Sequence, residues 1–203
     1  MNTSDFIKRL DIRFDIYSLS KEWWDLYDNN LLDAMMKGDQ IGLTHTRDCD
    51  VDNRWHQGIG SLMWDEKWGL KEGDFTELNI ELKKICPYWW EVCNEMKSKF
   101  SIGRIRIMVM KPNTSYPTHR DFERRWHIPI ISPKDSFYYV RTNENNMYND
   151  DILESSHGIG FHMPNDGFVY EVEAGKWHTA VNSSSQDRKP ARWRVHLVFD
   201  EAL

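Results

Sequence analysis

In the second half of the chain, short strand-like segments follow one another with no helix of useful length between them. Pro, Gly, Asn and Asp separate the segments, and β-branched and aromatic residues are frequent within them. This pattern predicts an antiparallel β-sandwich or barrel. The candidate strands are Arg104–Met110, Arg125–Ile131, Ser136–Val140, Gly158–Met163, Gly167–Glu173, Thr179–Asn182 and Arg192–Asp200.

The first hundred residues carry helical periodicity instead. Apolar residues recur every three or four positions from Ser18 to Lys37, with Ser20 as the candidate N-cap. The same spacing returns from Asp74 to Phe100, where Pro87 predicts either a kink or the start of a new helix. Because 203 residues fit one ordinary domain, we expect a helical part, residues 1–100, packed on a β core, residues 101–203.

Charge and cysteine content exclude several classes of protein. The chain has 26 basic and 32 acidic residues, a net charge of −6, which is the wrong sign for general binding to nucleic acid phosphates. It has no apolar run of about 18 residues, so no membrane helix is predicted. The three cysteines form no C-x-x-C pair and predict neither a disulfide framework nor a zinc site. We therefore expect a cytoplasmic protein without a membrane or nucleic-acid partner.

The segment Thr118-His119-Arg120-Asp121 carries the clearest chemical signal. In an extended chain residues i and i+2 share a face, so His119 and Asp121 can point to one spot. His178 lies two or three predicted strands later, which is enough chain for a sandwich to return beside His119. Two histidines and one carboxylate form the set that holds Fe(II) and leaves positions open for a cosubstrate and O₂.

An oxygenase that uses 2-oxoglutarate also needs a cation for the distal carboxylate of this cosubstrate. Arg194 lies among apolar residues on the last predicted strand, where a buried arginine needs an anionic partner. By alternation Arg194, His196 and Val198 should share one face of that strand. Arg188 is the competing candidate, but it lies in the polar segment Gln186-Asp187-Arg188-Lys189-Pro190, which we expect to be solvated.

Four segments are informative as an ordered set: RIRIMVMKPNTSYPTHRD, RRWHIPII, GFVYEVEAGKWHTAVN and RVHLVFD. Together, from about Gly103 to Asp200, they resemble the aspartyl/asparaginyl β-hydroxylase family of Fe(II)/2-oxoglutarate-dependent oxygenases. The resemblance implies a double-stranded β-helix core of the jelly-roll or cupin-like type, with flanking helices. It also implies roles for six residues: His119, Asp121 and His178 as iron ligands, Arg194 as the 2-oxoglutarate anchor, and Arg125 and His127 facing this cosubstrate.

The predicted activity is hydroxylation of an unactivated C–H bond, with release of succinate and CO₂. By analogy with the family, the substrate is an amino acid of the Asp, Asn or Pro type, free or in a peptide. The basic residues Arg120, Arg124 and Arg125 near the H-x-D segment favour a small-molecule or peptide substrate that bears a carboxylate. Two alternatives stay open: a cupin-like metal-binding protein or isomerase that does not use 2-oxoglutarate, and a non-catalytic binding module.

Other polar clusters are weaker candidates. His157 and His162 could be ligands by spacing, but they flank glycines in an expected turn. Asp48, Asp50 and Asp52 imitate the start of a calcium-binding loop, yet Asn53 occupies the position where that loop requires glycine.

Overall fold

The core of the protein is a pair of antiparallel sheets that face each other. The computed structural model describes residues 6–62, 69–121, 124–141, 158–185 and 190–202. Eight strands of the second half build both sheets: β5 (Ile102–Met110), β6 (Thr114–Ser115), β7 (Arg125–Ile131), β8 (Ser136–Arg141), β9 (Gly158–Phe161), β10 (Phe168–Val172), β11 (His178–Asn182) and β12 (Arg194–Glu201).

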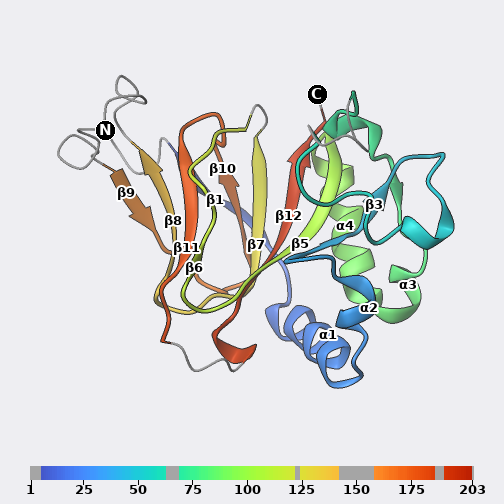
Figure 1. Ribbon diagram of the computed structural model, residues 1–203, viewed down its shortest axis with the longest axis horizontal. Helices are drawn as coiled ribbons and strands as arrows, with labels where there is room; N and C mark the ends of the chain where they lie inside the picture. Colours follow the sequence, from blue (N-terminus) through green and yellow to red (C-terminus); the bar gives the residue numbers. More distant parts are fainter. Residues whose placement is uncertain (1–5, 63–68, 122–123, 142–157, 186–189, 203) are drawn as a thin grey trace.

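The order of the strands defines the fold. One sheet contains β10-β7-β12-β5 and the other β6-β11-β8-β9, so the chain crosses repeatedly from sheet to sheet (Figure 1). This arrangement is a double-stranded β-helix, a jelly roll, and it confirms the predicted fold class. All six ladders between these eight strands are antiparallel.

The first hundred residues contribute strands as well as helices. β1 (Ile7–Arg13) pairs with β10, and β2 (Gln40–Gly42) pairs with β5, so both extend the larger sheet to six strands. β3 (Thr44–His45) and β4 (Glu77–Leu78) form a separate ribbon. The helices are α1 (Ile16–Asp28), α2 (Leu32–Met35), α3 (Leu82–Ile85) and α4 (Pro87–Lys99), with the 3₁₀ turns η2 (Val51–Asn53), η4 (Glu72–Asp74) and, later in the chain, η5 (Pro190–Arg192).

The helix boundaries differ from the predicted ones for local reasons. Asp15, not Ser20, caps α1, because its carboxylate accepts hydrogen bonds from the Tyr17 amide and the Ser18 hydroxyl. The first helical stretch breaks where Asn30 adopts a left-handed φ of 56°. Asp74 does not begin a helix, because its carboxylate accepts the Lys71 amide and closes η4. Pro87 occupies the first turn of α4.

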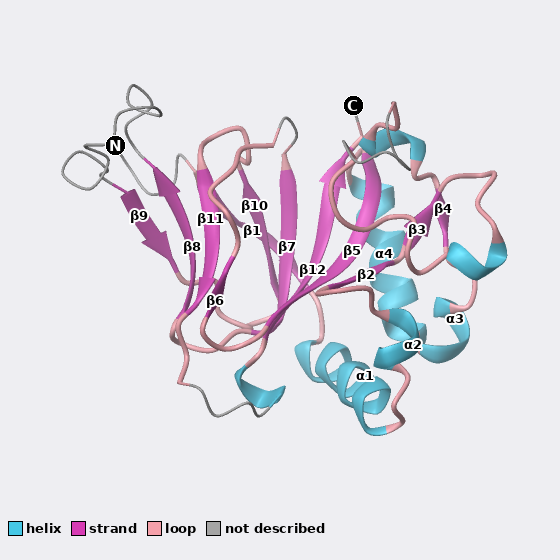
Figure 2. Ribbon diagram, in the orientation of Figure 1, coloured by secondary structure: helices cyan, strands magenta, loops and turns pink. Residues whose placement is uncertain are grey.

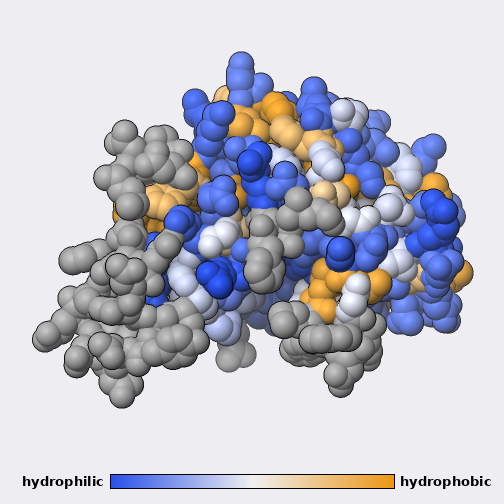
Figure 3. Space-filling model, turned by 90° about the horizontal axis from the view of Figure 1, so that it is seen from above, coloured by the Kyte–Doolittle hydropathy of each residue, from blue (hydrophilic) through white to orange (hydrophobic). Residues whose placement is uncertain are grey.

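Helices cover one face of the larger sheet (Figure 2). The buried core on this face combines Val195, Leu197 and Phe199 of β12 with Trp23 of α1 and Trp89 of α4. In the view from above, the described surface shows several hydrophobic patches among hydrophilic residues (Figure 3). None of the described helices is long and apolar enough to span a membrane.

The other face of the larger sheet is polar and points toward the smaller sheet. Along β12 the residues Arg194, His196 and Asp200 alternate with the apolar ones, and all three are buried. The register places His127 and Arg125 of β7 beside Val198 and Asp200, on this same face. Charged residues buried between the two sheets need oppositely charged or hydrogen-bonding partners. These polar residues of the inner face therefore mark the region of the candidate site.

Candidate metal centre

Backbone pairing brings the H-x-D segment beside the start of β11. The His119 amide donates to the His178 carbonyl at 2.9 Å, and the His178 amide donates to the His119 carbonyl at 2.7 Å. The Asp121 amide donates to the carbonyl of Ala174 at 3.0 Å. These bonds keep the segment extended, so His119 and Asp121 turn their side chains to the same side as His178.

Three ligand atoms converge there. His178 Nε2 lies 3.3 Å and His119 Nε2 lies 3.6 Å from Asp121 Oδ2. All three atoms lie within 4.8 Å of one another, and the described residues contain no other such group of three His, Cys, Asp or Glu side chains. Neighbouring ligands on an ion with bonds of about 2.1 Å lie about 3 Å apart, so this spacing suits a single metal ion.

Both histidines are oriented for metal binding by their second ring nitrogen. His119 Nδ1 lies 2.8 Å from the Pro117 carbonyl oxygen, and His178 Nδ1 lies 2.7 Å from the Lys176 carbonyl oxygen. A carbonyl oxygen only accepts, so each Nδ1 carries the proton and each Nε2 presents a lone pair. Two imidazole nitrogens and one carboxylate oxygen fit the facial set that binds Fe(II).

The charge states match this role. Burial by itself raises the pKa of Asp121, but the contact with His178 and the charge of Arg125 outweigh it and lower that pKa to about 2. Burial also lowers the pKa of His119 below its ordinary value. Near neutral pH Asp121 is therefore ionised and His119 is neutral, the forms in which both side chains coordinate a metal.

Arg194 lies further along the inner face of the larger sheet, at the start of β12. It is 4% exposed, and within the part of the chain that the structure describes no Asp or Glu lies within ion-pairing distance. Burial lowers its pKa to about 10, although nearby Tyr116 and Tyr138 oppose this shift. A buried cation in this state calls for an anionic ligand, so its surroundings fit the carboxylate of 2-oxoglutarate.

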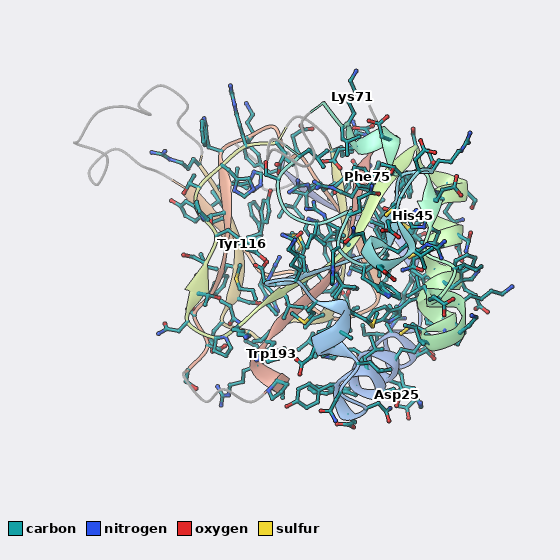
Figure 4. The ribbon with its side chains drawn as sticks, turned by 45° about the vertical axis from the view of Figure 1, so that its right-hand side comes forward. Asp25, His45, Lys71, Phe75, Tyr116 and Trp193 are labelled. Carbon is teal, nitrogen blue, oxygen red and sulfur yellow. The ribbon has the colours of Figure 1, made fainter. Side chains whose placement is uncertain are left out.

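Three further polar atoms on the inner faces are buried and lack a hydrogen-bond partner among the described residues: Tyr138 Oη, His127 Nε2 and His196 Nε2. The buried Tyr116 hydroxyl lies near the Asp39 carboxylate. The side chain of Tyr116 enters the space between the sheets (Figure 4). The Tyr138 ring stacks on His178 with centroids 4.9 Å apart. The two other imidazoles face each other, with His127 Nδ1 and His196 Nδ1 3.4 Å apart. Unsatisfied polar atoms of this kind indicate a polar ligand.

The structure separates the three basic residues that the sequence grouped. Arg125 is buried between two carboxylates, 2.6 Å from Asp121 and 2.5 Å from Asp200, so its charge is compensated. Arg124 is exposed and lies 3.8 Å from a Glu171 carboxylate oxygen. Arg120 is exposed with its guanidinium 5.6 Å from the Trp177 ring centroid.

Of the competing histidines, His162 is described by the structure and does not join the centre. His162 is exposed, and its Nδ1 lies 3.0 Å from the Ser136 carbonyl oxygen. His157 and Arg188 lie outside the described residues. Sequence reasoning assigned no role to Asp200, Tyr116 or Tyr138. For Asp200 a signal existed, since it follows Arg194 and His196 at even spacing on one strand, whereas nothing local marks the tyrosines.

Comparison with known proteins agrees with this geometry. The family model described as Aspartyl/Asparaginyl beta-hydroxylase matches residues 21–154. The match begins within α1, well before Gly103, so the similarity to this family also includes most of the helical part of the chain. It includes His119 and Asp121 but ends before His178 and Arg194. A search of curated protein sequences gives no significant match.

Solved structures with the same fold include AviO1 from Streptomyces viridochromogenes Tue57 and EvdMO1. AviO1 is 11% identical with a TM-score of 0.50, and the alignment covers 96% of this chain and 88% of AviO1. EvdMO1 is 12% identical with a TM-score of 0.51, and the alignment covers 96% of this chain and 46% of EvdMO1. The chain belongs to the aspartyl/asparaginyl β-hydroxylase family and is a 2-oxoglutarate-dependent oxygenase.

Proposed function

We propose that this oxygenase binds Fe(II) through His119, Asp121 and His178 and hydroxylates a C–H bond of an amino acid, free or in a peptide. The convergence of two Nε2 atoms and one carboxylate oxygen within 4.8 Å carries this proposal. In the overall reaction, substrate, 2-oxoglutarate and O₂ give hydroxylated substrate, succinate and CO₂. Fe(II), when bound, supplies the oxidative chemistry, which no side chain of the protein can provide.

The protein binds and orients the reactants. Arg194 anchors the distal carboxylate of 2-oxoglutarate, and the neutral Tyr138 hydroxyl can donate a hydrogen bond to an anionic ligand. Burial depresses the pKa of His127 and His196 well below the ordinary value, so both imidazoles are uncharged and face the cosubstrate as hydrogen-bonding groups. A cupin-like protein without 2-oxoglutarate has no evident need for a buried arginine such as Arg194.

We propose that the substrate bears a carboxylate. The amino acid that is hydroxylated is of the Asp, Asn or Pro type, either free or within a peptide. The exposed Arg120 has no carboxylate partner among the described residues, and its charge near the segment is what supports this assignment. In the extended segment its side chain points away from His119 and Asp121 and lies over Trp177, so it does not face the candidate metal centre. Arg124 and Arg125 contribute less than the sequence suggested, since each already lies beside carboxylates.

Succinate formation tests the proposal. The purified protein is incubated with Fe(II), 2-oxoglutarate and O₂ in the presence of free amino acids or short peptides containing Asp, Asn or Pro. We expect succinate that requires both Fe(II) and 2-oxoglutarate and increases with the correct substrate. His178→Ala should abolish this succinate, whereas the matched control His162→Ala should leave it unchanged. Full activity of His178→Ala, or stimulation by single-stranded nucleic acid alone, contradicts the proposal.

A further inference from the structure

A buried ionic network surrounds Asp200 at the end of β12. Arg106 Nη2 lies 2.7 Å and Arg104 Nε lies 3.2 Å from Asp200 Oδ2, while Arg125 Nε lies 2.5 Å from Asp200 Oδ1. Glu72 of η4 closes the far side of the network through an ion pair of 2.6 Å with Arg104. Asp200 is fully buried, and each of these arginines is at most 8% exposed.

The sheet itself positions this network. Arg104 and Arg106 come from β5 and Arg125 from β7, the two strands that flank β12. The ladder places Arg125 directly beside Asp200. Burial opposes ionisation of Asp200, but Arg106, Arg125 and Arg104 hold its pKa well below the ordinary value, so it is an anion. A buried anion surrounded by cations on rigid strands has little freedom to move.

Arg125 links this network to the candidate metal centre. Its Nη1 lies 2.6 Å from Asp121 Oδ2, the oxygen atom that faces both histidines. Asp121 lies outside the strands, in the connection that leads to β7. The bond of its amide to the Ala174 carbonyl sets the side to which its side chain turns, but it does not fix the position of the carboxylate group. The contact with Arg125, which is itself held by Asp200, restricts the carboxylate to the side where His119 and His178 converge.

We propose that Asp200, acting through Arg125, is a positioning residue that holds the Asp121 carboxylate in place for the metal ion. This inference rests on the proposed function, because it requires the triad to bind a divalent metal. An ionised carboxylate has enough lone pairs for Arg125 and a metal at the same time. Arg125 thereby gains a role through Asp121, in addition to any contact with the cosubstrate.

Metal affinity tests this role without relying on turnover. Fe(II), and Mn(II) as a redox-stable probe, are titrated anaerobically into the full chain and into Asp200→Asn, which keeps the shape but removes the charge. Losing a direct partner of a metal ligand usually weakens binding about 10–100-fold, and Asp200 acts one contact further away, through Arg125, so we expect binding weaker by about tenfold. Glu72→Gln is the matched control. Glu72 belongs to the same network but contacts neither Arg125 nor Asp121, so this variant should bind metal like the wild type.

Three further variants keep the test decisive: Arg125→Lys, Asp121→Asn, and Asp121→Asn combined with Asp200→Asn. Arg125→Lys retains a cation that cannot bridge both carboxylates, and it should show the same loss if Asp200→Asn fails to fold. In an Asp121→Asn background, Asp200→Asn should have no further effect on metal affinity. If Asp200→Asn and Arg125→Lys both bind metal with wild-type affinity, the inference is overturned and the proposed function stays intact. The same holds if Asp200→Asn weakens metal binding equally in the wild type and in the Asp121→Asn variant. Absence of metal binding by the wild type overturns the proposed function and this inference with it.

Discussion

At the scale of single residues, Arg194 and Arg125 show how burial and partners decide the role of a charge. Both are buried on the inner face of the larger sheet, but Arg125 contacts Asp121 and Asp200, while Arg194 contacts no carboxylate among the described residues. An anionic cosubstrate should therefore bind more favourably to Arg194 than to Arg125, whose charge is already compensated.

We expect Arg194→Ala to weaken 2-oxoglutarate binding roughly a hundredfold to several thousandfold. Truncation leaves the cosubstrate carboxylate buried and unpaired, which costs about 3–5 kcal/mol. Direct measurement of 2-oxoglutarate affinity checks this. The control Arg192→Ala removes an exposed arginine at the end of η5, two residues before Arg194, and should change the affinity by no more than about fivefold. A large loss in Arg188→Ala with a small one in Arg194→Ala would show that the anchor was assigned to the wrong arginine.

At the scale of elements, the short turn η4 docks on the end of β5 through a titrating side chain. Burial, reinforced by the charge of Asp200, raises the pKa of Glu72 to about 7 despite the neighbouring Arg104. The unfolded value is near 4.5, so the folded protein binds a proton that the unfolded chain releases between these two pH values. The contribution of Glu72 to stability is thus present below about pH 4.5 and is lost as the pH rises through about 7.

The free energy of unfolding of the wild type relative to Glu72→Gln should therefore fall by about 2–3 kcal/mol between pH 4.5 and pH 8. Urea unfolding of both proteins across this range measures the difference. Buried His127 and His196 also titrate abnormally, but both proteins contain them, so their effect cancels. A constant or increasing difference would contradict the raised pKa of Glu72.

The elements themselves were predictable where the local pattern was strong. β7 has the predicted bounds, and β5 and β12 differ from the predicted ones by one or two residues. β1 was missed although its charged and apolar residues alternate, because seven residues of alternation ahead of a helical stretch are a weak signal. The very short β2, β3, β4 and β6 are strands only through their partners, so no local pattern identifies them.

At the scale of the whole molecule, the larger sheet separates stability from chemistry. Its apolar face packs on α1 and α4, and its polar face holds Arg194, Arg125 and Asp200 toward the smaller sheet. Substitutions on the two faces of one strand should therefore have different consequences.

Leu197→Ala tests this separation, because Leu197 is fully buried on the helix-covered face of β12. We expect a loss of about 2–5 kcal/mol in the free energy of unfolding, from lost burial and the cavity left behind. The affinity for metal and for 2-oxoglutarate should not change below the unfolding temperature. Unfolding and titration experiments on one preparation check both expectations, and weaker metal binding with unchanged stability would contradict the assignment of the faces.

Local sequence patterns are enough to predict the periodicities, and with them the class of fold, the shared face of His119 and Asp121, and the side of β12 that carries Arg194. These properties follow from backbone geometry, which repeats every two residues in a strand regardless of what lies opposite. Which charges are compensated follows only from the folded arrangement. Arg125 contacts Asp121 and Asp200, Tyr116 and Tyr138 lie near Arg194, and Glu72 pairs with Arg104. The energy of a buried charge depends on partners distant in sequence, and only the packing of the two sheets brings those partners together.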